Sequence, residues 1–116
     1  MTLESMSEAE LWDIATPIMD NLMDGSTEIE HSKHTRDFSQ RMLNIVTPEY
    51  LDKVCKSYQT EKGFFAVREP VAIFNRPDSI AFIWKQHFTK VNGEFVAEMV
   101  LIQDGSKYLV DHVMIF

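Results

Sequence analysis

The period of the hydrophobic pattern changes once along this chain, near Gly63, and that change constrains the fold more than any other feature. Before Gly63, apolar residues recur every three to four positions, which is the spacing of amphipathic helices. After Gly63 they alternate in four runs separated by turn sequences, which is the pattern of β-strands. This order predicts an α+β domain in which N-terminal helices pack on a curved four-stranded antiparallel sheet.

Start and stop signals predict three helices, over about residues 7–24, 27–45 and 48–61. The first begins at a capping box of Ser7 and Glu10, and the second at a similar pair, Thr27 and Glu30. Within the second, residues 31–37 are polar all round, so a short exposed helix or a loop is expected there. The third begins at Thr47-Pro48, where a hydroxyl caps the helix and proline occupies its first position.

Two residues are expected to disturb the first helix. Pro17 removes a backbone donor and clashes with the preceding turn, so we expect a kink or a restart there. Gly25 is expected to end the helix, because glycine readily adopts the left-handed conformation of a helix C-terminus.

Four strands are predicted over about residues 64–74, 79–91, 94–103 and 107–116. Asn92-Gly93 and Asp104-Gly105 favour two-residue hairpin turns, so consecutive strands are expected to form an antiparallel meander. Pro70 cannot donate to a neighbouring strand, which predicts an edge strand or a bulge.

The turns also predict a register, with Val91 opposite Glu94 and Gln103 opposite Ser106. One face of the sheet is then almost wholly apolar and is expected to meet the helices. The opposite face mixes charged residues with more large aliphatic residues than a solvated face needs, so it is expected to form an interface.

The length of 116 residues, with 45% hydrophobic and 25% charged residues, predicts one globular domain over residues 1–116. A net charge of −7 without a basic cluster argues against a nucleic-acid partner and against binding to an anionic membrane surface. Cys55 is the only cysteine, and the N-terminal segment is polar and acidic. These features predict a cytoplasmic protein without a membrane span.

Aromatic and polar residues on the apolar face suggest a small-molecule pocket. The candidates are Trp12, Tyr58, Trp84, Gln86, Tyr108 and His112. Within this set His112 is a candidate acid or base near neutral pH. The alternative is that His112 and Gln86 are core-edge residues whose polar atoms bind a helix backbone, which is the commoner fate of buried polar groups.

A homodimer is predicted through the mixed face of the sheet. The candidate interface residues are Lys85, His87, Val96, Glu98, Val100, Leu109, Asp111 and Val113. Under the predicted register His87, Glu98 and Asp111 form one row, and paired carboxylates can divide acid and base roles. A salt-bridged ladder or a dimer contact is the more ordinary reading of such a row.

No metal or cofactor is predicted. Glu28, His31 and His34 are spaced three apart, but the outer two diverge on a helix and no further ligand pair completes a site. Cys55 falls on the apolar stripe of its helix, which favours an inert core thiol over a nucleophile. No nucleotide-binding or nucleophile-elbow motif occurs.

The order of helices before a long-stranded meander resembles the cystatin-like α+β roll of the nuclear transport factor 2-like superfamily. Asp37-Phe38-Ser39 followed by Thr47-Pro48-Glu49 also looks like small bacterial members of unknown function. The resemblance implies a curved sheet wrapped around the helices into a cone, dimerisation through the outer sheet face, and in some members an apolar ligand in the cone. It leaves function open, because members include both enzymes and binding modules.

Two function classes follow. The first is a non-catalytic homodimeric module that binds a small apolar ligand or a partner protein, and it is favoured because no reactive constellation occurs. The second is a small isomerase, cyclase or dehydratase with His112 as its base in an aromatic-lined pocket. A titratable partner beside His112 would favour the enzyme.

Overall fold

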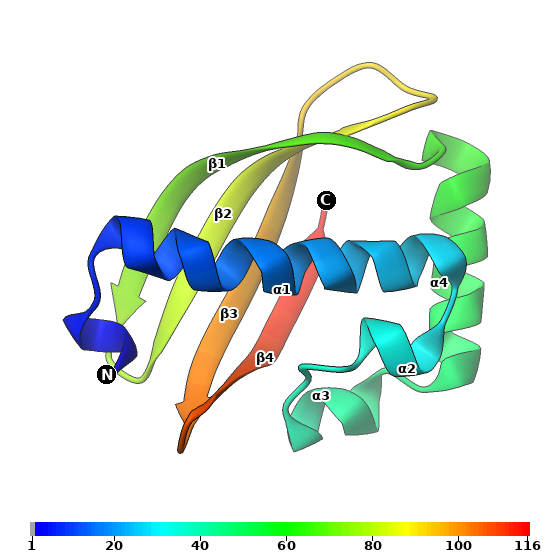
Figure 1. Cartoon of the computed structure of the whole chain (residues 1–116). Coiled ribbons are helices and arrows are strands. Elements are labelled where there is room, and N and C mark those ends of the chain that lie inside the picture. The colour runs from blue at the N-terminus through cyan, green and yellow to red at the C-terminus, as the bar shows by residue number, and fades with distance from the viewer. Residues whose placement is uncertain (1) are drawn as a thin grey trace.

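The computed structural model describes residues 2–116, which form four helices and then a four-stranded antiparallel sheet (Figure 1). A short 3-10 turn, η1 (Leu3–Ser5), precedes the helices. The helices and strands are α1 (Glu8–Glu28), α2 (His31–His34), α3 (Gln40–Ile45), α4 (Pro48–Lys62), β1 (Phe65–Arg76), β2 (Ser79–Phe88), β3 (Phe95–Asp104) and β4 (Lys107–Ile115). The predicted α+β class, with helices before the sheet, is confirmed.

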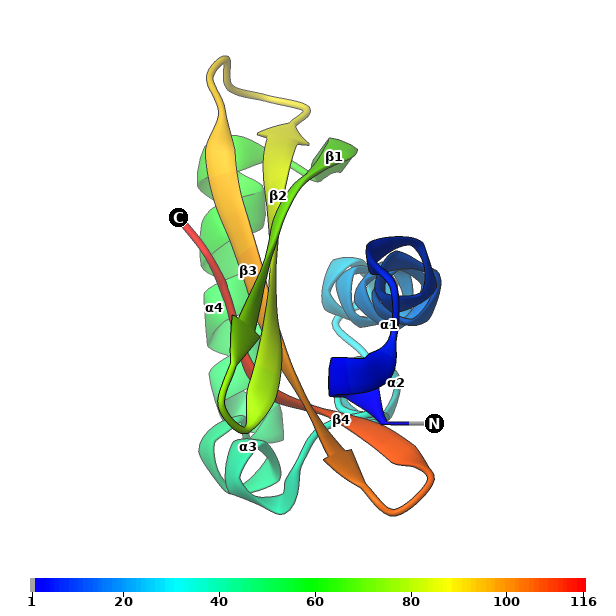
Figure 2. The ribbon, with the colours of Figure 1, turned by 90° about the vertical axis from the view of Figure 1, so that its left-hand side faces the viewer.

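The sheet is an open meander in the order β1-β2-β3-β4. Helix α1 lies across one face of it, and α4 stands beside β4 at the edge of the sheet (Figures 1 and 2). The face turned toward α1 is called the inner face here, and the opposite one the outer face. Alternate β2 residues on the inner face are buried, as the period-two pattern predicts.

Aromatic side chains fill the space between α1 and the inner face. Trp12 of α1 packs edge-on against Phe82 and Trp84 of β2, with each pair of ring centroids 5.3 Å apart. Met19 and Met99 are also fully buried in this core. The expected ligand cone is therefore occupied by core side chains at this position.

Helix α1 continues through Pro17 and Gly25, so neither a restart at Pro17 nor a helix end at Gly25 occurs. Pro17 is exposed, which lets water bind the carbonyl that its missing N–H leaves free. Gly25 is buried because α2 passes against it: a Cβ built on Gly25 would lie 2.5 Å from the backbone nitrogen of His34. Glycine at this position permits close packing of two helices.

The range 27–45 does not form one helix but two short ones, α2 and α3. The expected short helix or loop over 31–37 is confirmed by α2 and the loop after it. The chain turns at Ile29, which adopts a left-handed φ of 53° after α1. It enters α3 at Ser39, whose hydroxyl accepts from the Met42 N–H. The predicted helix over 48–61 is confirmed within one residue, with Thr47 as its cap.

Both predicted hairpin pairings are wrong, although each error leaves the faces of the strands unchanged. Strand β2 ends before Thr89, and Trp84 pairs with Ala97, which shifts the predicted pairing by an even number of residues. The last turn places Asp104 opposite Lys107, again an even shift. In β1, the prediction from Pro70 is confirmed, because β1 is an edge strand with an irregular register at that residue.

A bulge in β4 does change the faces. Leu101 pairs with Val110, but the preceding residue, Val100, pairs with His112, so Asp111 is an extra residue in the strand. Beyond the bulge, Val113 pairs with the buried Met99 and turns inward. His112 therefore points to the outer face, and the predictions of an inward His112 and an outward Val113 are wrong.

Candidate binding groove

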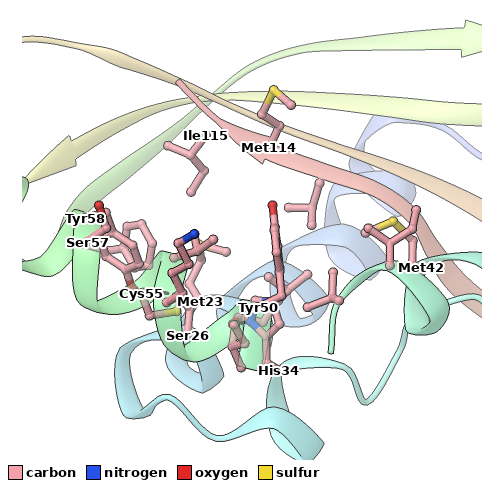
Figure 3. A pocket seen from close by; sticks show the side chains of 18 of the residues that line it. Met23, Ser26, His34, Met42, Tyr50, Cys55, Ser57, Tyr58, Met114 and Ile115 are labelled. Carbon is pink, nitrogen blue, oxygen red and sulfur yellow. Dashed lines mark hydrogen bonds between the residues drawn. The ribbon is translucent and has the colours of Figure 1, made fainter. Parts of the chain in front are cut away.

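A groove of about 630 Å³ separates α4 from β4 (Figure 3). Helix α1 contributes Leu22 and Ser26 to its lining, and α3 with the following loop closes one end. Tyr50 reaches from α4 toward β4, and Ile115 reaches back from the strand. The volume falls within the range of small-molecule and peptide sites.

Large apolar side chains on the groove walls are exposed to solvent. Ile45 is 52% exposed, Tyr50 51%, Val54 40% and Met114 51%. Tyr50 and Val54 lie four residues apart on α4, on a stripe next to the one that buries Leu51 in the core. The groove therefore presents an apolar surface that nothing within residues 2–116 covers.

Basic side chains outnumber acidic ones around the groove. Arg41, Lys53 and Lys62 line it against one carboxylate, Glu61, in a chain whose net charge is −7. The Lys62 ammonium group lies 5.6 Å from the centre of the Phe95 ring. The local charge is thus opposite in sign to that of the whole chain.

Neutral polar groups line the groove where α4 meets α1. The Ser26 hydroxyl lies 2.7 Å from the Tyr58 hydroxyl and 3.2 Å from the Cys55 sulfur. Burial raises the pKa of the Cys55 thiol and also the pKa of the Tyr58 hydroxyl. Both groups therefore stay protonated near neutral pH, which disfavours Cys55 as a nucleophile.

The two histidines of the Glu28, His31, His34 motif bind backbone carbonyls. The His31 Nε2 lies 2.7 Å from the Val46 oxygen, and the His34 Nδ1 lies 3.0 Å from the Leu22 oxygen. Burial lowers the pKa of His34, which lines the groove as a neutral ring. These contacts give both rings structural roles in joining α2 to its neighbours.

His112 lies at the mouth of the groove and binds Glu98 on the outer face. Its Nε2 is 2.8 Å from a Glu98 carboxylate oxygen, and both side chains are half-buried. The predicted row of His87, Glu98 and Asp111 does not form. Instead, His87 faces Glu69 at 3.4 Å, and Asp111 accepts from Ser39 and Arg41.

Five of the six predicted pocket residues are divided among three places. Trp12 and Trp84 pack in the core between α1 and the sheet. Tyr108 lines a second cavity, of about 620 Å³, between the start of β4 and α3. Only Tyr58 and His112 reach the groove.

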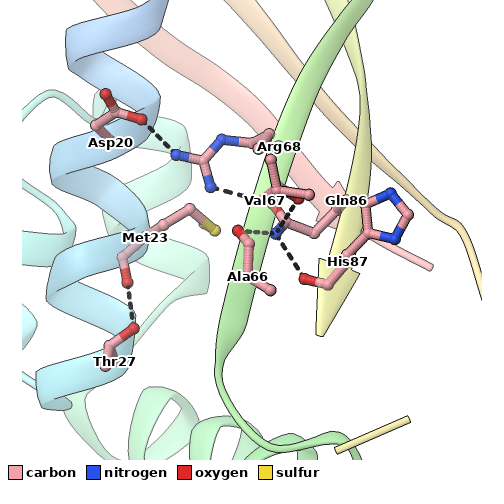
Figure 4. Close-up of polar contacts among 8 residues, drawn as sticks. All are labelled: Asp20, Met23, Thr27, Ala66, Val67, Arg68, Gln86 and His87. Carbon is pink, nitrogen blue, oxygen red and sulfur yellow. Dashed lines mark hydrogen bonds and ion pairs between the residues drawn. The ribbon is translucent and has the colours of Figure 1, made fainter. Parts of the chain in front are cut away.

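Gln86, the sixth pocket candidate, is fully buried and satisfies the irregular backbone of β1 (Figure 4). Its amide nitrogen donates to the carbonyls of Ala66 at 3.2 Å and Val67 at 3.5 Å, within the first register shift of β1. Its amide oxygen accepts from Arg68, which also pairs with Asp20 of α1. Gln86 is thus a buried structural residue, but the expected helix backbone is not its partner: it binds strand carbonyls and Arg68.

Of the predicted interface residues, the aliphatic ones differ in accessibility. Val96 is 36% exposed on the outer face, whereas Val100 is only 8% exposed. Leu109 lines the second cavity, and Lys85 pairs with Glu94 at 2.9 Å. Most charged candidates are therefore engaged within the chain.

The sequence reasoning missed Tyr50, Val54 and the α4–β4 groove. Val54 precedes the buried Cys55 on α4, but it lies at the margin of the buried stripe and is 40% exposed. The helical spacing of Tyr50 and Val54 was visible in the sequence, but the gap beside them depends on where α4 meets the sheet. Periodicity gives the faces of a helix and does not give the distance to its neighbour.

No family model and no curated protein sequence matches the chain. Among solved structures, the chain is similar to Bd1075 of Bdellovibrio bacteriovorus, with a TM-score of 0.56 and 8% sequence identity. The match covers 96% of this chain and 44% of that one, so the chain spans less than half the length of that protein. At this identity the likeness shows the fold alone.

Within residues 2–116, no helix is both long enough and apolar enough to cross a membrane.

Proposed function

We propose that the chain is a non-catalytic binding module whose α4–β4 groove takes an apolar ligand with a negative charge. The observation that carries this proposal is the set of exposed apolar side chains inside the groove, which includes Ile45, Tyr50 and Val54. Covering them removes apolar surface from water. The basic excess around the groove favours an anionic group on the ligand.

The chemistry of the groove supports binding rather than catalysis. Cys55 and Tyr58 have raised pKa values and are protonated, while His34 has a lowered pKa and is neutral. Catalytic sites more often tune such groups toward the operating pH. The pKa shifts of Cys55, Tyr58 and His34 all lead away from the neutral range.

The alternative is a small isomerase, cyclase or dehydratase, and the His112–Glu98 pair is the observation that favours it. A carboxylate bound to a histidine orients the ring in many enzymes. Here the pair is on the outer face, beside the groove mouth. Hydrolysis of para-nitrophenyl acetate that is lost in His112→Ala would favour a reactive histidine.

The binding proposal is tested with anilinonaphthalene sulfonate, which combines an apolar ring system with an anion. Its fluorescence should rise on binding, and Tyr50→Ala should weaken the affinity about tenfold, because an exposed tyrosine contributes mainly apolar contact. Phe74→Ala is the matched control, since Phe74 is also about half exposed but lies on β1. Equal affinity for both variants would contradict the proposal.

Three further expectations stay predictions. The order of helices and strands supports membership in the nuclear transport factor 2-like superfamily. The exposed Val96 on the outer face supports a homodimer through that face. A cytoplasmic location is the third expectation, and the presence of a single cysteine supports it.

A further inference from the structure

The edge of β4 that faces the groove carries unpaired backbone groups. The backbone of Phe116 exchanges two hydrogen bonds with Val96 of β3. In an antiparallel pair such bonded positions alternate, so the N–H and C=O groups of Val113 and Ile115 point away from β3. They point toward the groove, and no partner for them occurs within residues 2–116.

The same edge is already occupied at its beginning. The Val110 N–H donates to the Asp37 carbonyl, and the Ser39 N–H donates to the Val110 carbonyl. Phe38 thus forms a parallel bridge with Val110, and Arg41 donates to the Asp111 carbonyl. The unpaired backbone N–H and C=O groups of β4 begin only after this point, because the chain has by then turned away from β4 into α3.

Helix α4 forms the wall opposite this open edge. Tyr50 and Val54 face the groove from α4, and Ile115 faces it from β4 (Figure 3). A slot with a strand edge on one side and apolar helix residues on the other suits an added strand. Its backbone would bind the edge, and alternate side chains would contact the helix.

The charges around the slot indicate which kind of strand fits. Lys53 and Lys62 make no ion pair within 4 Å in the described part of the chain, residues 2–116, whereas Arg41 pairs with Asp111. Their two ammonium groups are thus without a carboxylate partner there, on a protein of net charge −7. A second copy of the chain has its own β4 edge flanked by α4, and the two α4 helices would hold the two edges apart, so it is a poor occupant.

We propose that the edge of β4 from His112 to Phe116 takes up an extended acidic peptide of a partner protein as a fifth strand. The peptide alternates β-branched residues, which contact Tyr50 and Val54, with carboxylates, which reach Lys53 and Lys62. This inference rests on the proposed binding function and specifies its ligand class.

The experiment uses a fluorescein-labelled peptide of sequence EVTVDVE and measures its binding by anisotropy. Two matched peptides separate the contributions: KVTVKVK reverses the charge, and EVTVDVE with N-methyl groups on alternate amides keeps the side chains but loses the edge hydrogen bonds. We expect each to bind at least about tenfold more weakly. In NMR spectra, the amide protons of Val113 and Ile115 should move downfield and exchange more slowly with EVTVDVE.

Variants of the protein give independent tests. Lys62→Glu should weaken EVTVDVE binding several-fold and strengthen KVTVKVK binding, whereas Lys107→Glu, an exposed lysine at the far end of β4, should change neither. Ile115→Pro removes an N–H from the free edge without removing a bond to β3, so it should also weaken binding. The N-methylated peptide keeps the test decisive if Ile115→Pro does not fold.

The outcomes distinguish this inference from the proposed function. If anilinonaphthalene sulfonate binds in a Tyr50-dependent way but EVTVDVE and its N-methylated form bind equally or not at all, the groove is a small-molecule site and the strand inference is overturned. If neither the dye nor the peptide binds, both proposals fall. A peptide that binds without shifting the Val113 and Ile115 amides also overturns the inference.

Discussion

At the scale of single residues, the buried side chain of Gln86 supplies hydrogen bonds to an irregular part of the backbone. Gln86 binds the carbonyls that the irregular start of β1 leaves without a β2 partner, and Arg68 extends the same network to α1. No buried side-chain nitrogen or oxygen within residues 2–116 lacks a hydrogen-bond partner. The register shift of β1 thus explains why a polar residue, Gln86, lies on the apolar face of β2.

Gln86→Leu should destabilise the fold by about 1–3 kcal/mol, because the fully buried amide donates to the carbonyls of Ala66, Val67 and His87 and accepts from Arg68, and leucine can make none of these hydrogen bonds. Urea denaturation of the variant measures this change. Gln40→Leu on the exposed side of α3 is the control and should stay within about 0.5 kcal/mol of the parent. A Gln86→Leu protein as stable as the parent would show that water satisfies those carbonyls.

Cys55 should react slowly with thiol reagents in the folded state and quickly after unfolding. Its side chain is 1% exposed, and burial raises the pKa of its thiol, so the reactive thiolate is scarce and shielded. Labelling with dithionitrobenzoate in buffer and in urea measures both rates. In a Cys55→Ser background, Ser57→Cys places a thiol on the exposed side of the same helix, and it should label rapidly.

His34 should make stability depend on pH below neutrality. Burial lowers its pKa from the ordinary 6.5, so the folded state favours the neutral ring. This contribution is present above about 6.5 and is lost as the pH falls through the lower folded-state pKa. His34→Asn, which keeps a donor toward the Leu22 carbonyl, should flatten the fall in unfolding free energy between about pH 7.5 and pH 5. If the unfolding free energy of His34→Asn falls with pH as steeply as that of the parent, other groups cause the pH dependence.

At the scale of elements, the contact between α1 and α2 depends on the absence of one side chain. Gly25 has an ordinary helical position, yet the backbone of His34 lies where its Cβ would be. Helix propensity alone would favour alanine at this position by about 1 kcal/mol. The close approach of α2 outweighs that preference, and it explains why a predicted helix end is a helix interior.

Gly25→Ala should therefore destabilise the fold by about 1–3 kcal/mol, the usual cost of overpacking. The collision is with backbone atoms, which cannot rotate away as a side chain can. Thermal or urea denaturation measures the change. Thr16→Ala, on the exposed side of the same helix, should be neutral or slightly stabilising, and a stabilised Gly25→Ala would mean that α2 moves freely.

At the scale of the whole molecule, the outer face of the sheet presents a second surface, distinct from the groove. Its charges are largely paired within the chain, by Lys85 with Glu94 and by Glu98 with His112. Val96 lies between these pairs and is partly exposed. Paired charges and exposed aliphatic residues suit association of two copies, because few charges are left to be desolvated alone.

We expect a homodimer at tens of micromolar, and Val96→Asp should convert it to a monomer by adding a charge to the contact. Val96 is a better site than Val100, whose burial means that a charge there would unfold the monomer instead. Leu43→Asp is the matched control, because Leu43 is equally exposed on α3. Sedimentation velocity decides: a parent protein that sediments as a monomer ends this prediction.

The sequence by itself determined the α+β class, the third predicted helix and the inner face of β2. These depend on local spacing: Thr47-Pro48 starts a helix wherever it is placed, and alternation in β2 survives any even shift of register. The positions of the turns were less well predicted, because hairpin loops longer than two residues also accept Asn92-Gly93.

Tertiary structure alone decided the C-terminal end of α1, the bulge at Asp111 and the groove, whereas the capping box of Ser7 and Glu10 already marked the start of α1. Gly25 stays helical because α2 packs on it, and His112 turns outward because Ser39 and Arg41 bind Asp111 where β4 gains a residue. Each of these contacts joins residues far apart in the chain. Local propensity does not encode such contacts, so a one-residue bulge was enough to move His112 from the predicted pocket to the opposite face.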